Sequence, residues 1–216
     1  MNKKLNEGSR IYSSDKYKTI FVRVPKTGSN SIIHSIGNIF DKKNNNTLPK
    51  ECRVPGGMAV HIPASDIAKH MPEIWKNYFT FGFIRNPYYQ VISSYYQVKN
   101  KAIYKWPSLY NLDKLESIES YVPYILECFP TCRSIKQEIF LFDSNGNQLV
   151  DYIGKYENLQ SDYKFICKKI GIKYKPLERI NANQTNVDYD SLLTPYLKSM
   201  IAYELRDTFE ILGYKI

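Results

Sequence analysis

The sequence predicts an α/β fold: a single domain with a central, mainly parallel sheet flanked by helices. Two mainly apolar runs carry this prediction, residues 19–24 and residues 78–84, and each is followed by a helical pattern. The second run is apolar almost throughout, which is typical of a central strand buried on both faces. Strands that alternate with helices in this way indicate a parallel sheet. Residues 1–17 are polar, and we expect them to form a loose lead-in to a domain over residues 18–216.

The rest of the chain carries further signals of secondary structure. The sequence Asp-Ser-Asn-Gly-Asn at 143–147 predicts a hairpin that joins residues 138–142 to residues 148–156. An amphipathic pattern over 159–170 predicts a helix that ends at Gly171. Other helices are expected after the first strand as far as about Phe40, from Pro63 onward, over 87–99 and over 194–212. A short strand is expected over 58–62. Residues 100–136 are expected to be helical but irregular, and residues 178–190 to form a loop.

The charge of the chain points to an anionic partner. The net charge is +9, which suits a nucleotide, a nucleic acid, an acidic glycan or a membrane surface, while a solvated lysine-rich surface is the alternative. No run approaches the roughly 18 apolar residues of a membrane span, and residues 1–8 lack the apolar core of a secretory signal. The four cysteines are expected to be reduced thiols, because their spacing completes no zinc site: Cys52, Cys128, Cys132 and Cys167.

The most informative segment is Pro25-Lys26-Thr27-Gly28-Ser29-Asn30-Ser31, between the first strand and the first helix. Free N–H groups and the positive end of the helix dipole favour a phosphate group there. Lys26 adds a positive charge, and Ser29 and Ser31 add hydroxyl donors. The segment is not a Walker A loop, because Lys26 precedes its only glycine. It predicts a phosphate-bearing ligand, with a helix-capping turn that contains a chance lysine as the alternative.

A second anion site is expected where residues 78–84 end. Arg85 follows this strand directly, and Ser93 lies two turns into the next helix. A guanidinium group can bind two phosphate oxygens, and a serine hydroxyl adds a third contact. Both motifs follow the carboxyl ends of strands, where ligands of parallel sheets bind. The alternative is structural, with Arg85 bonded to a carbonyl group and Ser93 on a helix surface.

Taken together, the two motifs resemble those of the sulfotransferase superfamily, whose donor is 3′-phosphoadenosine-5′-phosphosulfate (PAPS). Residues 25–31 resemble its 5′-phosphosulfate loop, P-K-x-G-[ST]-x-[ST], and residues 85–93 resemble its 3′-phosphate motif, R-[DN]-P…S. The chain is most similar to the carbohydrate sulfotransferases, including heparan-type, dermatan-type and small bacterial members. The resemblance covers residues 18–214 and implies a fold like that of the P-loop NTPases.

The resemblance also implies which residues hold the donor. Lys26 and the backbone of residues 27–30 (Thr27, Gly28, Ser29 and Asn30) would bind the 5′-phosphosulfate, and Ser31 would bind the 5′-phosphate. Arg85 and Ser93 would bind the 3′-phosphate. Lys26 would also stabilise charge on the bridging oxygen as the sulfuryl group leaves. The match is weakest at Asn30, where the family often has Thr. No metal is required by this scheme, and the sequence shows no cluster of metal ligands.

A sulfotransferase of this kind needs a base that deprotonates the acceptor hydroxyl. His61 matches the histidine that serves as base in heparan and dermatan 2-O-type enzymes, and an imidazole suits this role near neutral pH. His34 and His70 lie within expected helices, where a packed or solvated role is favoured. The alternatives to His61 as base are Glu51 and Glu157, of which Glu157 is expected to pack against a turn. The structural alternative is that His61 caps a loop.

The acceptor is expected to be a carbohydrate hydroxyl, on a neutral or anionic glycan rather than on a nucleic acid. Aromatic and lysine side chains at 88–110 are candidates to line its cleft, with a core helix and a solvated charged run as the alternative: Tyr88, Tyr89, Tyr95, Tyr96, Lys99, Lys101, Tyr104, Lys105 and Trp106. Residues 179–185 are a candidate lid. Many animal relatives carry an N-terminal membrane anchor, and because none is seen here we expect a cytoplasmic enzyme of bacterial or viral origin.

Two other functions stay open on the sequence alone. A P-loop nucleotide kinase or NTPase would need a Walker-type lysine and an acidic Mg²⁺ ligand after a strand, and the sequence shows neither. A non-catalytic module that binds anionic glycans or nucleic acid would use the charge of +9 and would bind in a salt-sensitive way.

Overall fold

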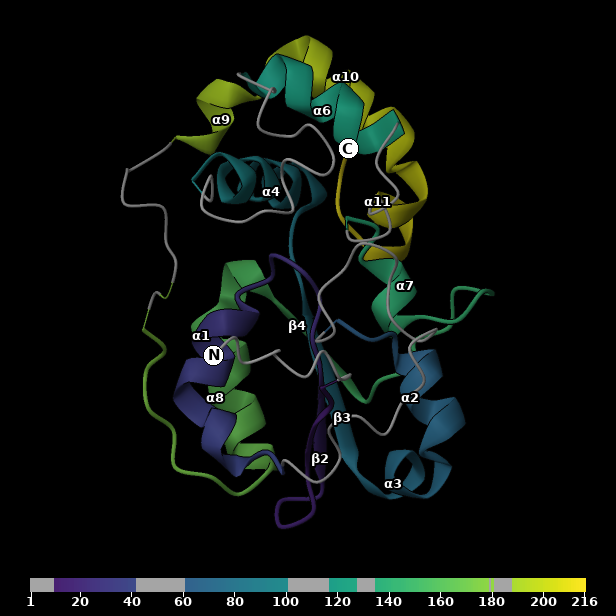
Figure 1. Cartoon of the computed structure of the whole chain (residues 1–216), viewed down its shortest axis with the longest axis vertical. Helices are drawn as coiled ribbons and strands as arrows, with labels where there is room; N and C mark the ends of the chain where they lie inside the picture. Colours follow the sequence, from purple (N-terminus) through teal and green to yellow (C-terminus); the bar gives the residue numbers. More distant parts are fainter. Residues whose placement is uncertain (1–9, 42–60, 101–116, 128–134, 179, 181–187) are drawn as a thin grey trace, which may run out of the picture.

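The structure is a computed structural model that describes residues 10–41, 61–100, 117–127, 135–178, 180 and 188–216. Its centre is a four-stranded sheet with the spatial order β1-β2-β3-β4 (Figure 1). The strands are β1 (Tyr12–Ser14), β2 (Thr19–Val22), β3 (Phe79–Ile84) and β4 (Tyr152–Lys155). The pairs β2–β3 and β3–β4 are parallel, and β1 runs antiparallel to β2. The predicted α/β class with a mainly parallel sheet is therefore confirmed.

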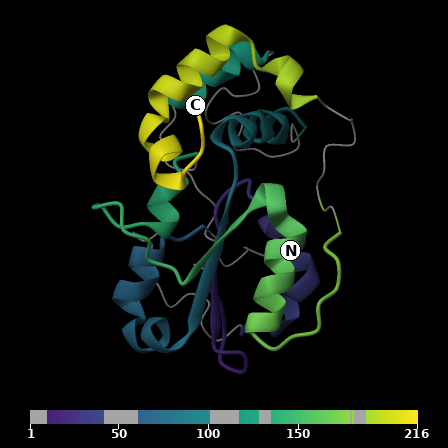
Figure 2. The ribbon, with the colours of Figure 1, turned by 180° about the vertical axis from the view of Figure 1, so that it is seen from behind.

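Helices cover both faces of this sheet. Helices α1 (Ser29–Ile36) and α8 (Leu159–Lys169) lie over one face, and α2 (Ala64–His70), α3 (Pro72–Asn77) and α7 (Glu138–Leu141) lie over the other, as both views show (Figures 1 and 2). The alternation of β3 explains the two layers, because Phe81 and Phe83 pack with the α1–α8 cluster while Ile84 packs with the α2–α7 cluster.

A third group of helices lies beyond the carboxyl ends of the strands. It contains α4 (Pro87–Asn100), α6 (Ile118–Glu127), α9 (Tyr189–Leu192), α10 (Pro195–Glu204) and α11 (Arg206–Leu212) (Figure 1). A separate apolar cluster holds them together, with Val91 and Ile92 of α4 against Val122 of α6 and Leu197 and Ile201 of α10. The chain thus encloses the carboxyl edge of the sheet, where both sequence motifs lie.

Strand β1 was not predicted from the sequence. The polar residues 1–17 predict a loose lead-in, but residues 12–14 form β1 and Asp15 follows it as part of the turn into β2. Ile11 and Tyr12 are buried in the core, and Ser13 and Ser14 are also buried. The sheet therefore begins before residue 18, because pairing with β2 buries a segment whose sequence is not strongly apolar.

The predicted hairpin at 138–156 is wrong in its strands. Residues 138–141 form the helix α7, and β4 pairs with β3 in parallel rather than with residues 138–142. Only the turn is present, with one isolated bridge between Phe142 and Gln148. Packing decides this outcome, since a Cβ atom at Gly82 of β3 would lie 2.5 Å from Cδ2 of Leu141. Gly82 gives Leu141 room against the sheet, and the short helix places both Phe140 and Leu141 in the core.

The other helices differ from the prediction mainly at their ends. Helix α1 ends at Ile36, and a 3₁₀ turn, η1 (Gly37–Ile39), continues it. The long final helix is divided at Leu205 into α10 and α11. The short strand expected over 58–62 lies outside the described residues except for His61 and Ile62, which form no strand. The predicted ends at Pro63 and Gly171 are confirmed, and Gly171 adopts a positive φ of 74°.

Candidate active site

The loop between β2 and α1 has an unusual backbone. Lys26 and Gly28 both have left-handed conformations, with φ of 66° and 82°. Glycine adopts such a conformation at little cost, whereas for lysine it is strained, and strain of this kind is concentrated at functional sites. A Cβ atom at Gly28 would also come within 3.2 Å of the Tyr156 ring. Turns of this type can direct successive N–H groups into an anion-binding hollow.

The N-terminus of α1 is open to a ligand. Gly28 is its N-cap residue, and no side chain of the described residues caps it. The N–H group of Ser31 bonds to the carbonyl of Gly28 at 3.0 Å, so the N–H groups of Ser29 and Asn30 are the first-turn donors that a ligand can reach. The first turn contains no acidic residue. This helix end therefore keeps the positive partial charge that favours a bound anion.

Three side chains hold the loop in place, one from the loop itself, one from α4 and one from the turn after β3. Thr27 is fully buried, and its hydroxyl donates to the carbonyl of Val24 at 3.0 Å. The Nε2 atom of Gln90 in α4 donates to the carbonyl of Pro25 at 3.1 Å. The Nη1 atom of Arg85 donates to the carbonyl of Lys26 at 3.4 Å. The structure thus brings the two sequence motifs into contact.

Arg85 is held between a buried amide and two aromatic rings. Its backbone N–H donates to Oε1 of Gln137 at 2.8 Å, and Nε2 of Gln137 donates back to its carbonyl at 2.7 Å. Its guanidinium carbon lies 4.1 Å from the ring centre of Tyr156 and 5.4 Å from that of Tyr189. Its Nε atom is buried without a hydrogen-bond partner, and no carboxylate of the described residues forms an ion pair with it. A buried donor of this kind is costly unless a ligand binds it.

Ser93 lies on α4, one turn beyond Gln90, and is half-buried. No hydrogen bond among the described residues joins it to Arg85. The structure therefore places Arg85 at the loop and leaves the part of Ser93 in the same site as a prediction.

His61 lies next to the loop. Its Nδ1 atom is 3.0 Å from the carbonyl oxygen of Arg23. A carbonyl oxygen can only accept, so Nδ1 carries the hydrogen and Nε2 is left as the basic nitrogen. Burial, together with the charges of Arg23 and Lys26, lowers the pKa of His61 to about 3. The imidazole is therefore neutral at pH 7 and lies within the electrostatic reach of Lys26.

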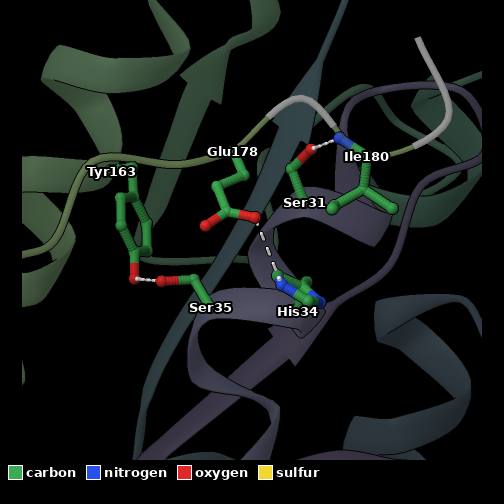
Figure 3. A network of polar contacts seen from close by, with 6 residues as sticks. All are labelled: Ser31, His34, Ser35, Tyr163, Glu178 and Ile180. Carbon is green, nitrogen blue, oxygen red and sulfur yellow. Dashed lines mark hydrogen bonds and ion pairs between the residues drawn. The ribbon is translucent and has the colours of Figure 1, made fainter.

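Ser31 is tied to the candidate lid at Ile180 (Figure 3). Its Oγ atom accepts from the backbone N–H of Ile180 at 3.2 Å, which leaves its hydroxyl hydrogen available for a ligand. Nε2 of His34 on α1 lies 3.5 Å from Oε2 of Glu178, and both side chains are exposed. The candidate lid itself, apart from Ile180, lies outside the described residues.

The site includes residues that were not found from the sequence, among them Arg23 and Gln137. Arg23 is buried at the end of β2, and its guanidinium donates to Tyr12, Ser29 and Asn30. Gln137 is fully buried against Arg85, as described above. A charged residue within the apolar run 19–24 is a signal that could have revealed Arg23, whereas nothing local to the sequence around Gln137 reveals its partner.

Glu157 and Glu51 were the alternative bases. Glu157 accepts from the N–H of Asn86 at 2.7 Å and from the hydroxyl of Tyr214 at 2.8 Å, so its carboxylate fixes the turn that follows Arg85. This agrees with the expectation that Glu157 packs against a turn. Glu51 lies outside the described residues.

The aromatic side chains of α4 divide between core and site. Tyr95 is buried and packs against Tyr121, and Tyr88 packs against Phe209. Tyr89 and Tyr96 lie against Tyr189, the residue that also contacts Arg85. Of the remaining candidates for the acceptor cleft, Lys99 lies on α4. The others lie outside the described residues: Lys101, Tyr104, Lys105 and Trp106.

In the described part of the chain, none of the helices is both long enough and apolar enough to span a membrane. This part of the chain also contains no group of three or more His, Cys, Asp or Glu side chains that could hold a metal ion. Of the four cysteines, Cys167 is described and is a buried free thiol, and the other three lie outside the described residues.

The chain is similar to known proteins in sequence and in fold. A protein of Archaeoglobus fulgidus that is described as uncharacterized is 31% identical over 109 residues, which cover 50% of this chain and 81% of that protein. The crystal structure of mouse sulfotransferase SULT7A1 complexed with PAP matches with a TM-score of 0.52 and 12% identity, over 92% of this chain and 85% of that one. This second likeness shows a shared fold. The sequence profile of the sulfotransferase family matches residues 9–211, so the chain belongs to the sulfotransferase family and the resemblance seen in the sequence is confirmed.

Proposed function

We propose that the protein transfers the sulfuryl group of PAPS to a hydroxyl group of a carbohydrate. The observation that carries this proposal is the contact between two anion sites, in which the Arg85 side chain bonds to the backbone of Lys26. PAPS carries anionic groups at both its 5′ and 3′ positions, so it matches a pair of sites better than a nucleotide with one phosphate chain does. Membership of the sulfotransferase family and the fold shared with a PAP-bound sulfotransferase support the choice of donor.

In this proposal each group of the donor meets a residue of the two motifs. Lys26 and the backbone of residues 27–30 bind the 5′-phosphosulfate, and the hydroxyl of Ser31 donates to the 5′-phosphate. Arg85 and Ser93 bind the 3′-phosphate. The local geometry supports these roles, because α1 has an open N-terminus and the buried Nε atom of Arg85 has no partner among the described residues. Bound anions would satisfy both features.

His61 acts as the base in the same proposal. Its Nε2 atom accepts the proton of the acceptor hydroxyl while the acceptor oxygen forms a bond to sulfur. The bond between sulfur and the bridging oxygen breaks, and Lys26 stabilises the charge that develops on that oxygen. A pKa of about 3 makes a weak base, and that value results first from burial and then from the charges of Arg23 and Lys26. A bound anion opposes these charges and raises the pKa of His61 toward its ordinary value.

The carbohydrate acceptor rests on the resemblance to carbohydrate sulfotransferases and on side chains near Arg85. Tyr89, Tyr96 and Tyr189 form an aromatic group beside Arg85, and aromatic faces suit sugar rings. The net charge of +9 favours a glycan that is itself anionic. These features make an anionic polysaccharide the first acceptor to test.

The test is a transfer assay with PAPS and four classes of acceptor, with products identified by mass spectrometry. The acceptors are a uronic-acid polysaccharide, a neutral oligosaccharide, a tyrosine peptide and a simple phenol. Sulfation of either carbohydrate, lost in the Lys26→Ala variant, supports the proposal. Sulfation of the peptide or the phenol alone contradicts the carbohydrate acceptor and leaves the donor in place. PAPS-independent hydrolysis of Mg²⁺-ATP would contradict the donor as well.

A further inference from the structure

We propose that Arg23 is a positioning residue for sulfuryl transfer, which orders the donor loop with its guanidinium group and the base with its carbonyl group. This inference rests on the proposed function, because it assigns Arg23 a part in binding the same donor. Arg23 lies outside both sequence motifs. Its side chain contacts the donor loop and its backbone contacts His61, so this one residue links the two.

The guanidinium group of Arg23 binds the first turn of α1 directly. Its Nη2 atom donates to Oδ1 of Asn30 at 2.8 Å and to Oγ of Ser29 at 3.2 Å. Its Nη1 atom donates to the hydroxyl oxygen of Tyr12 at 2.8 Å. Because Oγ of Ser29 accepts from Arg23, the hydroxyl hydrogen of Ser29 is left to donate to a ligand. Arg23 therefore fixes the direction of a hydroxyl donor in the loop whose backbone the proposed function assigns to the phosphosulfate.

The charge of Arg23 is not neutralised within the described part of the chain. The side chain is only 7% exposed, its Nε atom is buried without a hydrogen-bond partner, and no described carboxylate forms an ion pair with it. Buried charges in proteins are normally paired. Here the cation lies at the helix end that already carries positive partial charge, which adds to its cost. A bound anion at the N-terminal end of α1 would neutralise this charge, so the charge of Arg23 favours binding of the anionic donor.

The backbone of Arg23 serves the base. Its carbonyl accepts from Nδ1 of His61, and this contact selects the tautomer in which Nε2 is free to accept a proton. The guanidinium charge also lowers the pKa of His61, together with burial and the charge of Lys26. A purely structural Arg23 would stabilise the packing of Tyr12 against α1, and its replacement would leave nucleotide affinity unchanged in a variant that folds. The two roles therefore predict different results.

Three variants of the full chain separate these roles. Arg23→Gln removes the charge, Arg23→Lys keeps a charge without the planar fork, and Tyr12→Phe is a matched control that removes a bond to Arg23 but not its bonds to α1. Each variant is titrated with PAP by calorimetry, and the pKa of His61 is followed by NMR in the free protein. Thermal unfolding and far-UV circular dichroism check that each variant folds.

We expect Arg23→Gln to bind PAP about 10- to 100-fold more weakly, because a nearby buried charge contributes strongly to anion binding. The pKa of His61 should rise in this variant, and Arg23→Lys should restore part of both properties. Tyr12→Phe should bind PAP as the unchanged protein does. Folded Arg23→Gln with an unchanged PAP affinity and an unchanged His61 pKa would overturn the inference. If Arg23→Gln does not fold, Arg23→Lys decides, since normal values of both quantities there would also overturn it.

Failure of the proposed function gives a different pattern. In that case the unchanged protein does not bind PAP at all, whatever residue stands at position 23. The titration of His61 requires no nucleotide, so it still tests the link between Arg23 and the histidine.

Discussion

The guanidinium group of Arg85 lies within hydrogen-bond distance of the carbonyl of Lys26, 3.4 Å from Nη1 to oxygen, although 59 positions separate the two residues in the sequence. This contact joins the turn after β2 to the turn after β3. The two strands are parallel neighbours, so their carboxyl ends lie side by side and the residues that follow them meet. The candidate donor site is thus a direct consequence of the sheet topology.

Replacement of Lys26 by Ala should reduce turnover by at least about 100-fold, which is the typical effect of removing one group that stabilises developing charge. The fold should survive, because Thr27, Gln90 and Arg85 hold the loop through its backbone carbonyl groups. Steady-state kinetics with saturating donor measure the effect. Lys18→Ala is a matched control, since Lys18 is also a lysine with positive φ, of 45°, and lies in the β1–β2 turn. Equal losses in both variants would contradict the role of Lys26.

The stability of the fold should depend on pH through His61. Its pKa is about 3 in the folded protein and about 6.5 when unfolded, so between these values the unfolded chain binds a proton that the folded protein does not. The free energy of unfolding should therefore fall as the pH is lowered from about 6.5 toward 3, by up to about 1.4 kcal/mol per pH unit from this residue. Urea denaturation at several pH values measures this slope.

His61→Asn provides the control for the same residue. Its side-chain amide can still donate to the Arg23 carbonyl, but it has no titratable nitrogen and no equivalent of Nε2. The variant should lose the His61 part of the pH slope and most of its turnover, while PAP binding is kept. A variant that retains the full slope would show that His61 is not the group responsible, and near-normal turnover would exclude it as the base.

Gln137 should matter for Arg85 although it lies far from it in the sequence. It is fully buried. Its side-chain oxygen accepts a hydrogen bond from the Arg85 backbone, and its side-chain nitrogen donates one to it. Gln137→Leu leaves a buried N–H and a buried carbonyl group without these partners, at a cost of about 2–4 kcal/mol in the free energy of unfolding. Gln148→Leu is a comparable change at the bend after α7, with a smaller expected cost, because the amide of Gln148 bonds to one carbonyl, that of Val150. Similar losses for the two variants in chemical denaturation would contradict this account of Gln137.

The sequence predicted the parts of the site that depend on local pattern. The turns after β2 and β3 were located because each follows an apolar run and carries a cation with glycine, hydroxyl or proline residues. Arg23 was not predicted, because it lies within a run that is otherwise mainly apolar and predicts a buried strand. Its partners Tyr12, Ser29 and Asn30 come together only in the folded chain. The strand character expected of residues 138–142 was overridden by packing, since Leu141 fits over Gly82 as part of a helix. Contacts between distant segments, such as Gln137 with Arg85, have no signature in a single sequence.

The most direct test of the central claim is a calorimetric comparison of two nucleotides, PAP and adenosine 5′-phosphate, on the unchanged protein and on Arg85→Ala. The two ligands differ only in the 3′-phosphate, which the account assigns to Arg85. The unchanged protein should bind PAP at least about tenfold more tightly, the scale of a charge-assisted contact between arginine and phosphate. Arg85→Ala should bind both nucleotides with the same affinity. A preference for PAP that survives in Arg85→Ala, or no binding of PAP to the unchanged protein, would contradict the account.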